Sequence, residues 1–156
     1  AGTVALEGTN AYIGNYGNKF LRIDFGKEEI LWEYEDKNFP FFSSAALGPR
    51  QAVVGGRDKK LHCVNKTDGE AIWTFQTQGR VDSSPVICRD KVVVGSSDGF
   101  VYIVNLANGT PVWSYELGDS IISSPAVAKG MFVIGCDDGR VYAFGPGERK
   151  SDASDS

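Results

Sequence analysis

His62 is the residue of this sequence best suited to acid–base chemistry. A serine-nucleophile site would need it close to both a serine and an acid, and it is the single histidine among 156 residues. His62 stands at a position that recurs along the chain, where other copies carry Leu21, Tyr102 and Tyr142. We therefore predict a structural role for His62 and no catalytic residues.

The sequence gives little support for metal or thiol chemistry. Cys63, Cys88 and Cys136 are widely separated and show no Cys-x-x-Cys spacing, so we predict three free, mostly buried thiols. The Asp-Asp-Gly turn at 137–139 resembles the start of a calcium loop but lacks the further acidic ligands that such a loop needs. No glycine-rich phosphate loop is present. We predict neither a metal site nor an enzyme.

Aromatic and charged residues gather in one loop and its neighbours. Residues 35–42 read Glu-Asp-Lys-Asn-Phe-Pro-Phe-Phe, and this loop is one residue longer than its counterparts. Exposed aromatic residues beside arginine are enriched in binding hot spots. The candidate partner-binding residues are Phe39, Phe41, Phe42, Arg57, Lys59, Arg80 and Asp82.

Two of these aromatics have a second interpretation. Phe41 and Phe42 could plug a central channel or pack between neighbouring repeats, as Val81 and Ile121 would at the equivalent places. Phe39 has no apolar counterpart in the other loops. It is therefore the better candidate for a contact residue.

A repeat of about 40 residues must position these side chains. Its landmarks are tryptophans at 32, 73 and 113, Ser-Ser pairs at 43, 83 and 123, and glycines at 14, 55, 95 and 135. Each period contains short apolar runs bounded by turn residues, which predicts four strands; in the third they are 84–88, 91–95, 100–104 and 111–115. Asp-Gly at 98–99 and 138–139 predicts tight hairpins. The serine pairs are interpreted as small residues on crowded inner strands, and no window carries a helical pattern.

A repeated four-stranded antiparallel unit predicts an all-β propeller. We expect four blades, at about 3–35, 43–76, 83–116 and 123–145. The last blade is predicted to lack its outer strand, which leaves 15 strands, and the polar residues 146–156 are predicted to be disordered. Each tryptophan buries about 150–250 Å², so Trp32, Trp73 and Trp113 are predicted to dock one blade on the next.

The pattern Gly-x-x-Asp-Gly-x-Val-Tyr-x-x-Asn-x-x-x-Gly-x-x-x-Trp, followed by Ser-Ser-Pro, resembles the pyrroloquinoline-quinone-like (PQQ-like) propeller repeat over residues 3–145. The resemblance implies radially arranged blades, commonly eight, with the first strand of each lining the axis. Its members include quinoprotein alcohol dehydrogenases, an outer-membrane barrel-assembly lipoprotein that is a scaffold, and sensor domains. The dehydrogenases hold the quinone and Ca²⁺ with acidic and amide ligands, and many carry adjacent cysteines. This sequence has neither adjacent cysteines nor a matching acidic cluster, so neither PQQ nor Ca²⁺ is a predicted cofactor.

Charge and hydropathy exclude some partners. Lys and Arg number 16 against 20 Asp and Glu, and the net charge of −4 gives no electrostatic reason to expect nucleic acid. No apolar run approaches the roughly 18 residues that would span a bilayer, and no signal peptide is visible. Proteins with this repeat are mostly extracytoplasmic, which favours the same compartment here.

We predict a non-catalytic propeller that binds a protein or peptide through its loop rim, because loops on a rigid scaffold commonly carry function. The alternative is a fragment or half-ring of a quinone-dependent dehydrogenase or of a cofactor-sensing domain. Four blades make half of an eight-bladed ring, so we expect a homodimer that completes one. Truncation from a longer propeller and a closed four-bladed ring are the competing interpretations.

Overall fold

The computed structural model describes residues 4–36, 39–145 and 148–150, and their regular elements are all β-strands. They form four four-stranded antiparallel sheets, here called blades 1 to 4, each with its strands in chain order. Blade 1 contains β1 (Ala5–Glu7), β2 (Asn10–Gly14), β3 (Lys19–Asp24) and β4 (Glu29–Glu35). Blade 2 contains β5 (Ala46–Leu47), β6 (Gln51–Gly55), β7 (Lys60–Asn65) and β8 (Ala71–Gln76). Blade 3 contains β9 (Val86–Cys88), β10 (Lys91–Gly95), β11 (Phe100–Asn105) and β12 (Pro111–Glu116). Blade 4 contains β13 (Ala126–Ala128), β14 (Met131–Gly135), β15 (Val141–Gly145) and β16 (Glu148–Lys150).

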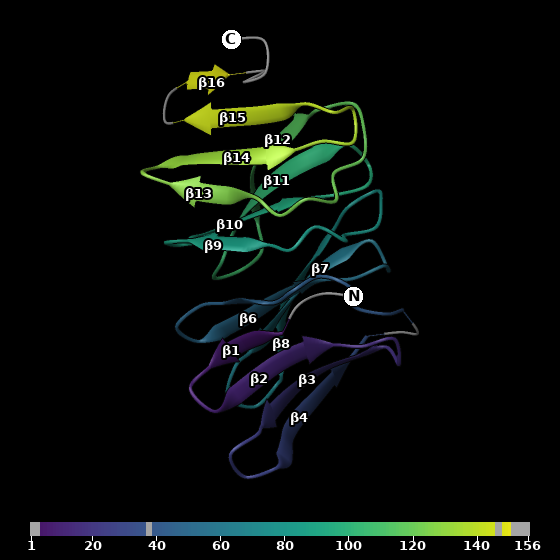
Figure 1. The fold of residues 1–156 in the computed structure, drawn as a ribbon, viewed down its shortest axis with the longest axis vertical. Helices are drawn as coiled ribbons and strands as arrows, with labels where there is room; N and C mark the ends of the chain where they lie inside the picture. Colours follow the sequence, from purple (N-terminus) through teal and green to yellow (C-terminus); the bar gives the residue numbers. More distant parts are fainter. Residues whose placement is uncertain (1–3, 37–38, 146–147, 151–156) are drawn as a thin grey trace.

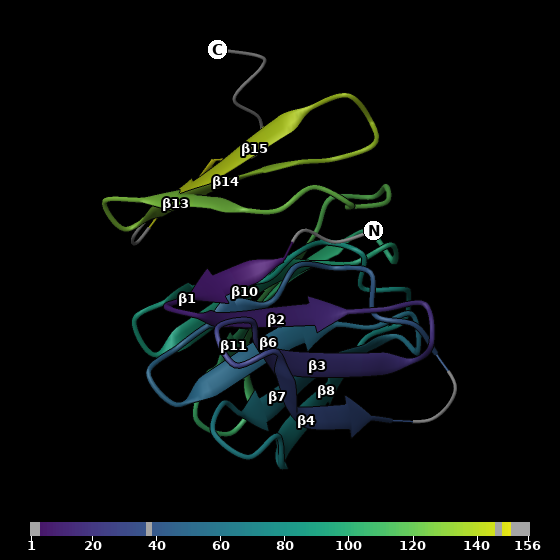
Figure 2. The same cartoon turned by 60° about the horizontal axis from the view of Figure 1, so that its bottom comes forward.

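The blades follow one another in chain order, and the first and last lie at opposite ends of the molecule (Figure 1). The innermost strand β9 contacts both β5 and β13, so first strands of successive blades are neighbours. In the turned view, blade 4 stands apart at the top and blades 1 to 3 overlap below it (Figure 2). The described chain is therefore a series of four propeller blades. The all-β class and the four-stranded antiparallel blade were both predicted from the repeat.

Blade 4 differs from the prediction in one strand. The sequence predicts three strands here, but β16 pairs antiparallel with β15, with Phe144 opposite Arg149. The prediction of a missing outer strand is therefore wrong. The edge of β15 offers main-chain N–H and C=O groups that a polar segment can pair with, so no apolar side chain is needed. Residues 146–147 and 151–156 of the predicted tail lie outside the described residues.

The turns between second and third strands share one geometry despite different sequences. Gly99 and Gly139 have positive φ angles of 87° and 85°, and Asn18 and Lys59 adopt 68° at the corresponding place. The Asp98 carboxylate accepts a hydrogen bond from the main-chain N–H of Phe100 at 2.9 Å. The aspartate thus closes the turn locally, which lets a non-glycine residue follow it in blade 2.

Three apolar clusters, one at each junction between neighbouring blades, form the core. The serine pairs form hydrogen bonds both within a blade and between blades. Ser43 Oγ accepts a hydrogen bond from Gly55 N at 2.7 Å, which links the start of blade 2 to its second strand. Ser83 Oγ donates to Ser123 O at 2.7 Å, which links blades 3 and 4. Their recurrence therefore reflects hydrogen bonding as well as the small size inferred from the sequence.

The tryptophans lie on the outermost strands and face the next blade. Trp32 donates from Nε1 to Lys66 O at 3.0 Å, and Trp73 donates to Leu106 O at 2.7 Å. Both indoles are nearly buried, with exposed fractions of 7% and 8%. Trp113 is only half-buried.

Among the described residues, no helix could cross a membrane.

Candidate partner-binding rim

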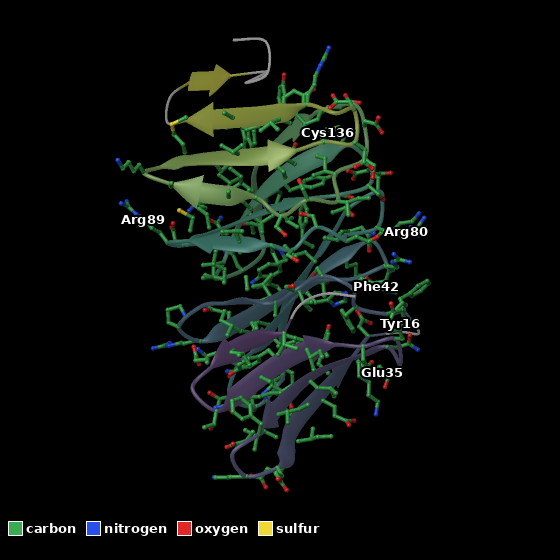
Figure 3. All side chains as sticks on the ribbon, viewed as in Figure 1. Tyr16, Glu35, Phe42, Arg80, Arg89 and Cys136 are labelled. Atoms are coloured by element: carbon green, nitrogen blue, oxygen red, sulfur yellow. The ribbon has the colours of Figure 1, made fainter. Side chains whose placement is uncertain are left out.

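The connections between blades and the turns between second and third strands lie along one edge of the molecule, here called the connection rim. Figure 3 shows Tyr16, Glu35, Phe42 and Arg80 on this edge, with Arg89 on the opposite one. The opposite rim carries the turns between first and second strands and between third and fourth strands. All candidate residues from the sequence belong to the connection rim or to the core just beneath it.

Phe41 does not belong to an accessible surface. Its side chain is 3% exposed and joins the core cluster between blades 1 and 2. A Cβ added at Gly14 would lie 2.6 Å from Phe41 Cβ, so the glycine makes room for this contact. Val81 and Ile121 are likewise fully buried against Gly55 and Gly95. Phe41 thus follows the second interpretation, packing between blades as Val81 and Ile121 do, and its place among the candidate contact residues is corrected.

Phe42 lies half-buried on the rim and is held by charged and aromatic neighbours. The guanidinium of Arg57 lies 3.8 Å from the ring centroid of Phe42. The same guanidinium forms two hydrogen bonds with Asp82, Nε to Oδ1 at 3.0 Å and Nη2 to Oδ2 at 3.1 Å. Since a bidentate pair fixes the plane of the guanidinium, Arg57 is oriented over the ring. The structure brings together three of the predicted residues, from blade 2 and its two connections.

Tyr16 completes this stack. Its ring meets Phe42 edge-on, with centroids 4.7 Å apart, and the residue is 70% exposed. Tyr16 is absent from the residues predicted from sequence, because that prediction drew mainly on the blade connections. A signal was present, since the same turn position carries Arg57, Ser97 and Asp137 in the other blades. An aromatic residue is exceptional there.

Phe39, Lys59 and Arg80 are the accessible members of the predicted set. Phe39 is 46% exposed, and Lys59 and Arg80 are exposed as well. Main-chain carbonyls of the two cationic residues support the rim: Lys59 O accepts from Thr77 N at 2.8 Å and Arg80 O accepts from Ser97 N at 2.9 Å. The backbone beneath these side chains is therefore fixed while the side chains face solvent.

His62 is buried beneath the same rim. Its Nε2 lies 2.8 Å from Asp58 Oδ2, and its Nδ1 lies 2.9 Å from the hydroxyl of Tyr34 in blade 1. Burial, with the nearby charges of Asp36 and Asp58, raises the pKa of Tyr34, so Tyr34 keeps its proton and can donate to Nδ1. The corresponding Asp98–Tyr102 and Asp138–Tyr142 hydrogen bonds measure 2.6 and 2.7 Å. His62 thus follows a position of the repeat, in agreement with the structural role inferred from sequence.

The same histidine belongs to a group whose composition could suit a metal ion. Ligand atoms of Asp36, Asp58 and His62 lie within 4.8 Å of one another. Both nitrogens of His62 already have partners, and Lys60 Nζ lies 3.2 Å from Asp36 Oδ2. Ca²⁺ takes six to eight oxygen ligands. Two carboxylates beside a lysine do not fit the calcium ion of the quinone enzymes.

The three cysteines are free thiols, as predicted. Cys63 and Cys136 are buried, whereas Cys88 is half-buried. Burial raises the pKa of the Cys63 thiol to about 12. A thiol of this kind stays protonated at neutral pH and does not act as a nucleophile.

Residues 40–150 match the protein family described as "Outer membrane protein assembly factor BamB". Among solved structures, BamB from Moraxella catarrhalis aligns with a TM-score of 0.83 and 20% identity, over 92% of this chain and 49% of that chain. The computationally designed Ika4 protein aligns with a TM-score of 0.82 and 14% identity, over 92% of this chain and 89% of that chain. The designed Ika8 protein aligns with a TM-score of 0.80 and 14% identity, over 90% of this chain and 44% of that chain.

These structural likenesses establish a shared fold. The chain spans about half the length of the BamB chain that it matches. No match is found among curated proteins.

Proposed function

The chain belongs to the family of the outer membrane protein assembly factor BamB, and on this premise we propose that it is a non-catalytic propeller scaffold that binds a protein or peptide partner. The contact surface is the rim patch, defined as Tyr16, Phe39, Phe42, Arg57, Lys59, Arg80 and Asp82. The family description names an assembly factor for outer membrane proteins, which favours a protein partner. It also favours an extracytoplasmic compartment.

One observation carries the proposal: an aromatic pair is held rigidly at the surface by a fixed arginine. Arg57 lies 3.8 Å from the Phe42 ring while Asp82 fixes its guanidinium, and Tyr16 covers the ring edge. Aromatic and arginine side chains dominate binding hot spots. A side chain already held in one conformation loses less entropy on binding. The patch therefore combines the residue types and the preorganisation that a protein contact needs.

The quinone-dependent dehydrogenase is the alternative, and no contact among the described residues favours it. His62 has both ring nitrogens engaged and is 0% exposed, so it is not available to a substrate outside the blades. The alternative has a direct assay. The chain is mixed with the quinone and Ca²⁺, and dye-linked oxidation of alcohols is followed. Turnover with a co-eluting quinone would replace the scaffold proposal.

The proposed contact is tested with a double variant, Phe39→Ala with Arg80→Ala. The immobilised chain is exposed to an envelope extract of the source organism, and bound proteins are quantified by mass spectrometry. Losing two contact side chains should reduce the recovery of a saturable partner about tenfold or more. Ile122→Ala is the matched control, because Ile122 is 53% exposed at another blade junction. Equal recovery with the double variant would contradict the placement.

We also propose that two chains complete one eight-bladed ring. Val93 and Val101 of blade 3 are 4% and 0% exposed beneath blade 4, whereas the equivalent Val133 and Val141 of blade 4 are 37% and 43% exposed. A face built for packing is thus left open, and exposed apolar faces mark interfaces. This chain aligns with 49% and 44% of two propeller chains, so a second copy has the size needed to supply the rest. A two-fold axis would then cover both end faces at once.

Solution mass tests the pairing. Light scattering should give about twice the 16.9 kDa of one chain, and Val141→Asp should convert the dimer to monomer by placing a charge in the joint. A monodisperse monomer with a cooperative melt would contradict the dimer. It would leave the rim proposal standing, because the rim patch lies on blades 1 and 2 and the connections of blade 2, away from the exposed face of blade 4.

A further inference from the structure

The turns between first and second strands lie on the opposite rim, directly after the inner strands of their blades. In blades 2, 3 and 4 these turns carry Arg50, Arg89 and Lys129, and all three residues are exposed. Figure 3 shows Arg89 at this edge of the molecule. Three successive blades therefore each present one exposed cation in the corresponding turn.

These three turns are neighbours in space. The inner strand β9 contacts both β5 and β13, with pairs of Cα atoms within 8 Å. The cations follow the ends of these strands by one to three residues. Arg50, Arg89 and Lys129 thus stand side by side along the inner part of the opposite rim, and together they are here called the cationic arc.

Main-chain hydrogen bonds hold two of the turns in place. Arg50 O accepts a hydrogen bond from Lys66 N at 2.8 Å, and Asp90 O accepts one from Leu106 N at 2.9 Å. Each bond ties an inner turn to the turn between third and fourth strands of the same blade. The backbone beneath the cations is therefore fixed before any ligand arrives, which reduces the entropy lost on binding.

The arc keeps its positive charge. The only acid within these turns is Asp90, and Lys91 Nζ contacts its carboxylate at 2.8 Å. Among the side chains that the structure describes, none forms an ion pair with a residue of the cationic arc. On a chain whose net charge is −4, this region attracts acidic groups.

The backbone at two of the cations is strained. Arg89 and Lys129 have φ angles of 56° and 51°, whereas blade 1 has Gly8 at the equivalent place with a φ of 60°. A left-handed backbone costs energy for a residue that carries a Cβ, and glycine avoids this cost. Blades 3 and 4 therefore keep a cation where glycine would be less strained, which supports a role for the side chain.

Other charges on the opposite rim favour a narrow ligand over a flat one. Glu28, Asp68 and Glu70 are exposed on the turns between third and fourth strands. A flat anionic surface, such as a membrane, would meet these carboxylates together with the arc and be repelled by them. An extended polypeptide can follow the arc alone. Its alternate side chains are about 6.6 Å apart, close to the separation of neighbouring inner strands.

We propose that the cationic arc binds an extended acidic segment of a partner polypeptide. Carboxylates at alternate positions of the segment lie on Arg50, Arg89 and Lys129 in turn. The site contains none of the residues of the rim patch and lies on the opposite rim. It is therefore a second docking surface, and it depends neither on the rim proposal nor on the pairing of two chains.

A labelled peptide tests the proposal. The probe has seven residues with aspartate at every second position and serine between, and it is titrated with the full chain while its fluorescence anisotropy is followed. It should bind saturably at low ionic strength, where exposed charges are least screened. A control peptide of the same composition, with its four aspartates in a row, should bind several-fold more weakly. A peptide with lysine in place of aspartate should not bind.

A triple variant locates the binding. Arg50→Gln, Arg89→Asn and Lys129→Asn together remove the three charges, and asparagine tolerates the positive φ of the two strained positions. Loss of three exposed ion pairs should weaken binding of the alternating peptide about tenfold. Thermal melts of the variant and the original chain should agree closely, because all three side chains are exposed.

A second triple variant is the matched control. Lys19→Gln, Lys27→Gln and Arg140→Gln remove the same charge at places outside the arc, and the peptide should bind nearly as tightly as to the original chain. Equal weakening by the two triple variants would overturn the proposal, because net charge alone would explain it. Absence of binding at millimolar peptide would overturn it as well. Binding of vesicles with anionic lipid, lost in the arc variant, would assign the arc to a membrane surface instead.

Discussion

Two blade junctions share one backbone and differ in what they present on the connection rim. The junction between blades 1 and 2 presents an aromatic pair beneath Arg57, with 70% of Tyr16 exposed. The junction between blades 3 and 4 carries Ser97, Ile122 and Asp137 at the corresponding positions. The repeat therefore fixes where rim side chains stand, and departures from it decide what they can bind.

The same two junctions also differ on the opposite rim, in the surroundings of the tryptophan. Between blades 1 and 2, Lys66 O accepts a hydrogen bond from Trp32 Nε1 and Gly69 packs on the indole face. Between blades 3 and 4, Trp113 is half-buried and lines a cavity.

The tryptophans should show the largest difference between the junctions. Trp32→Ala removes an almost buried indole and its hydrogen bond, and should lower the free energy of unfolding by about 3–5 kcal/mol. Trp113→Ala removes a half-buried ring beside an existing cavity, and should cost about 1–2 kcal/mol. Urea denaturation of both variants measures this. Equal losses would mean that the two junctions are equally well packed.

Phe41 and Phe39 separate packing from binding within one loop. Phe41→Ala should lower the free energy of unfolding by about 3–4 kcal/mol, because its side chain is 3% exposed. Phe39→Ala, at a 46% exposed residue, should change stability by less than about 0.5 kcal/mol while weakening partner binding. Thermal melts and partner capture on the same samples test both effects. Equal destabilisation by the two variants would contradict this division of roles.

Arg57→Lys keeps the charge of the rim patch but removes the planar fork. The pair with Asp82 is partly exposed, with side-chain exposures of 34% and 18%, so stability should change by less than about 1 kcal/mol. A lysine ammonium cannot form the bidentate pair with Asp82, and it has no planar group to stack on the Phe42 ring. Partner binding should weaken several-fold, measured by titration of the captured partner. Arg50→Lys is the control, since Arg50 is exposed on the opposite rim and lies outside the rim patch.

The smallest expected effect is the contribution of Asp138 to the stability of the fold at acidic pH. The hydroxyl of Tyr142 donates to it at 2.7 Å and is the leading cause that holds the pKa of Asp138 below its ordinary value of 3.8. A carboxylate whose pKa is lower in the folded state stabilises the fold at pH values above its unfolded-state pKa. This stabilisation is lost as the pH falls through the folded-state pKa. Asp138→Asn should therefore lose slightly less stability than the original chain between about pH 5 and pH 2. Urea midpoints at several pH values would detect the opposite trend.

The blades could be predicted because their signals are local. Alternating apolar runs and Asp-Gly turns lie within about 40 residues of one another. Lys59, which replaces the glycine of the Asp-Gly turns in blade 2, has a positive φ as those glycines do. The outer strand β16 could not be predicted the same way. Arg149 is part of a polar segment that pairs through its main chain, and side-chain patterns do not report such pairing.

Except for Tyr16, the residues of the rim patch were predicted from the sequence, but their arrangement was not. Arg57 and Asp82 are 25 residues apart in sequence, and only the stacking of blades brings them together above Phe42. His62 was recognised as a repeat position, but its contact with Tyr34 crosses a blade junction 28 residues away. For Phe41 the sequence left packing and partner contact open, and the space at Gly14 that its side chain occupies decides for packing.

Site-specific photo-crosslinking tests the central claim most directly. A benzophenone amino acid is placed at position 16, and in a matched variant at position 137, the same turn position in blade 4. Both variants are irradiated in an envelope extract of the source organism, and the adducts are identified by mass. We predict one defined protein adduct from position 16 and none of that mass from position 137. Equal crosslinking at both positions, or an adduct from position 137 alone, would contradict a binding surface built from Tyr16, Phe42 and Arg57.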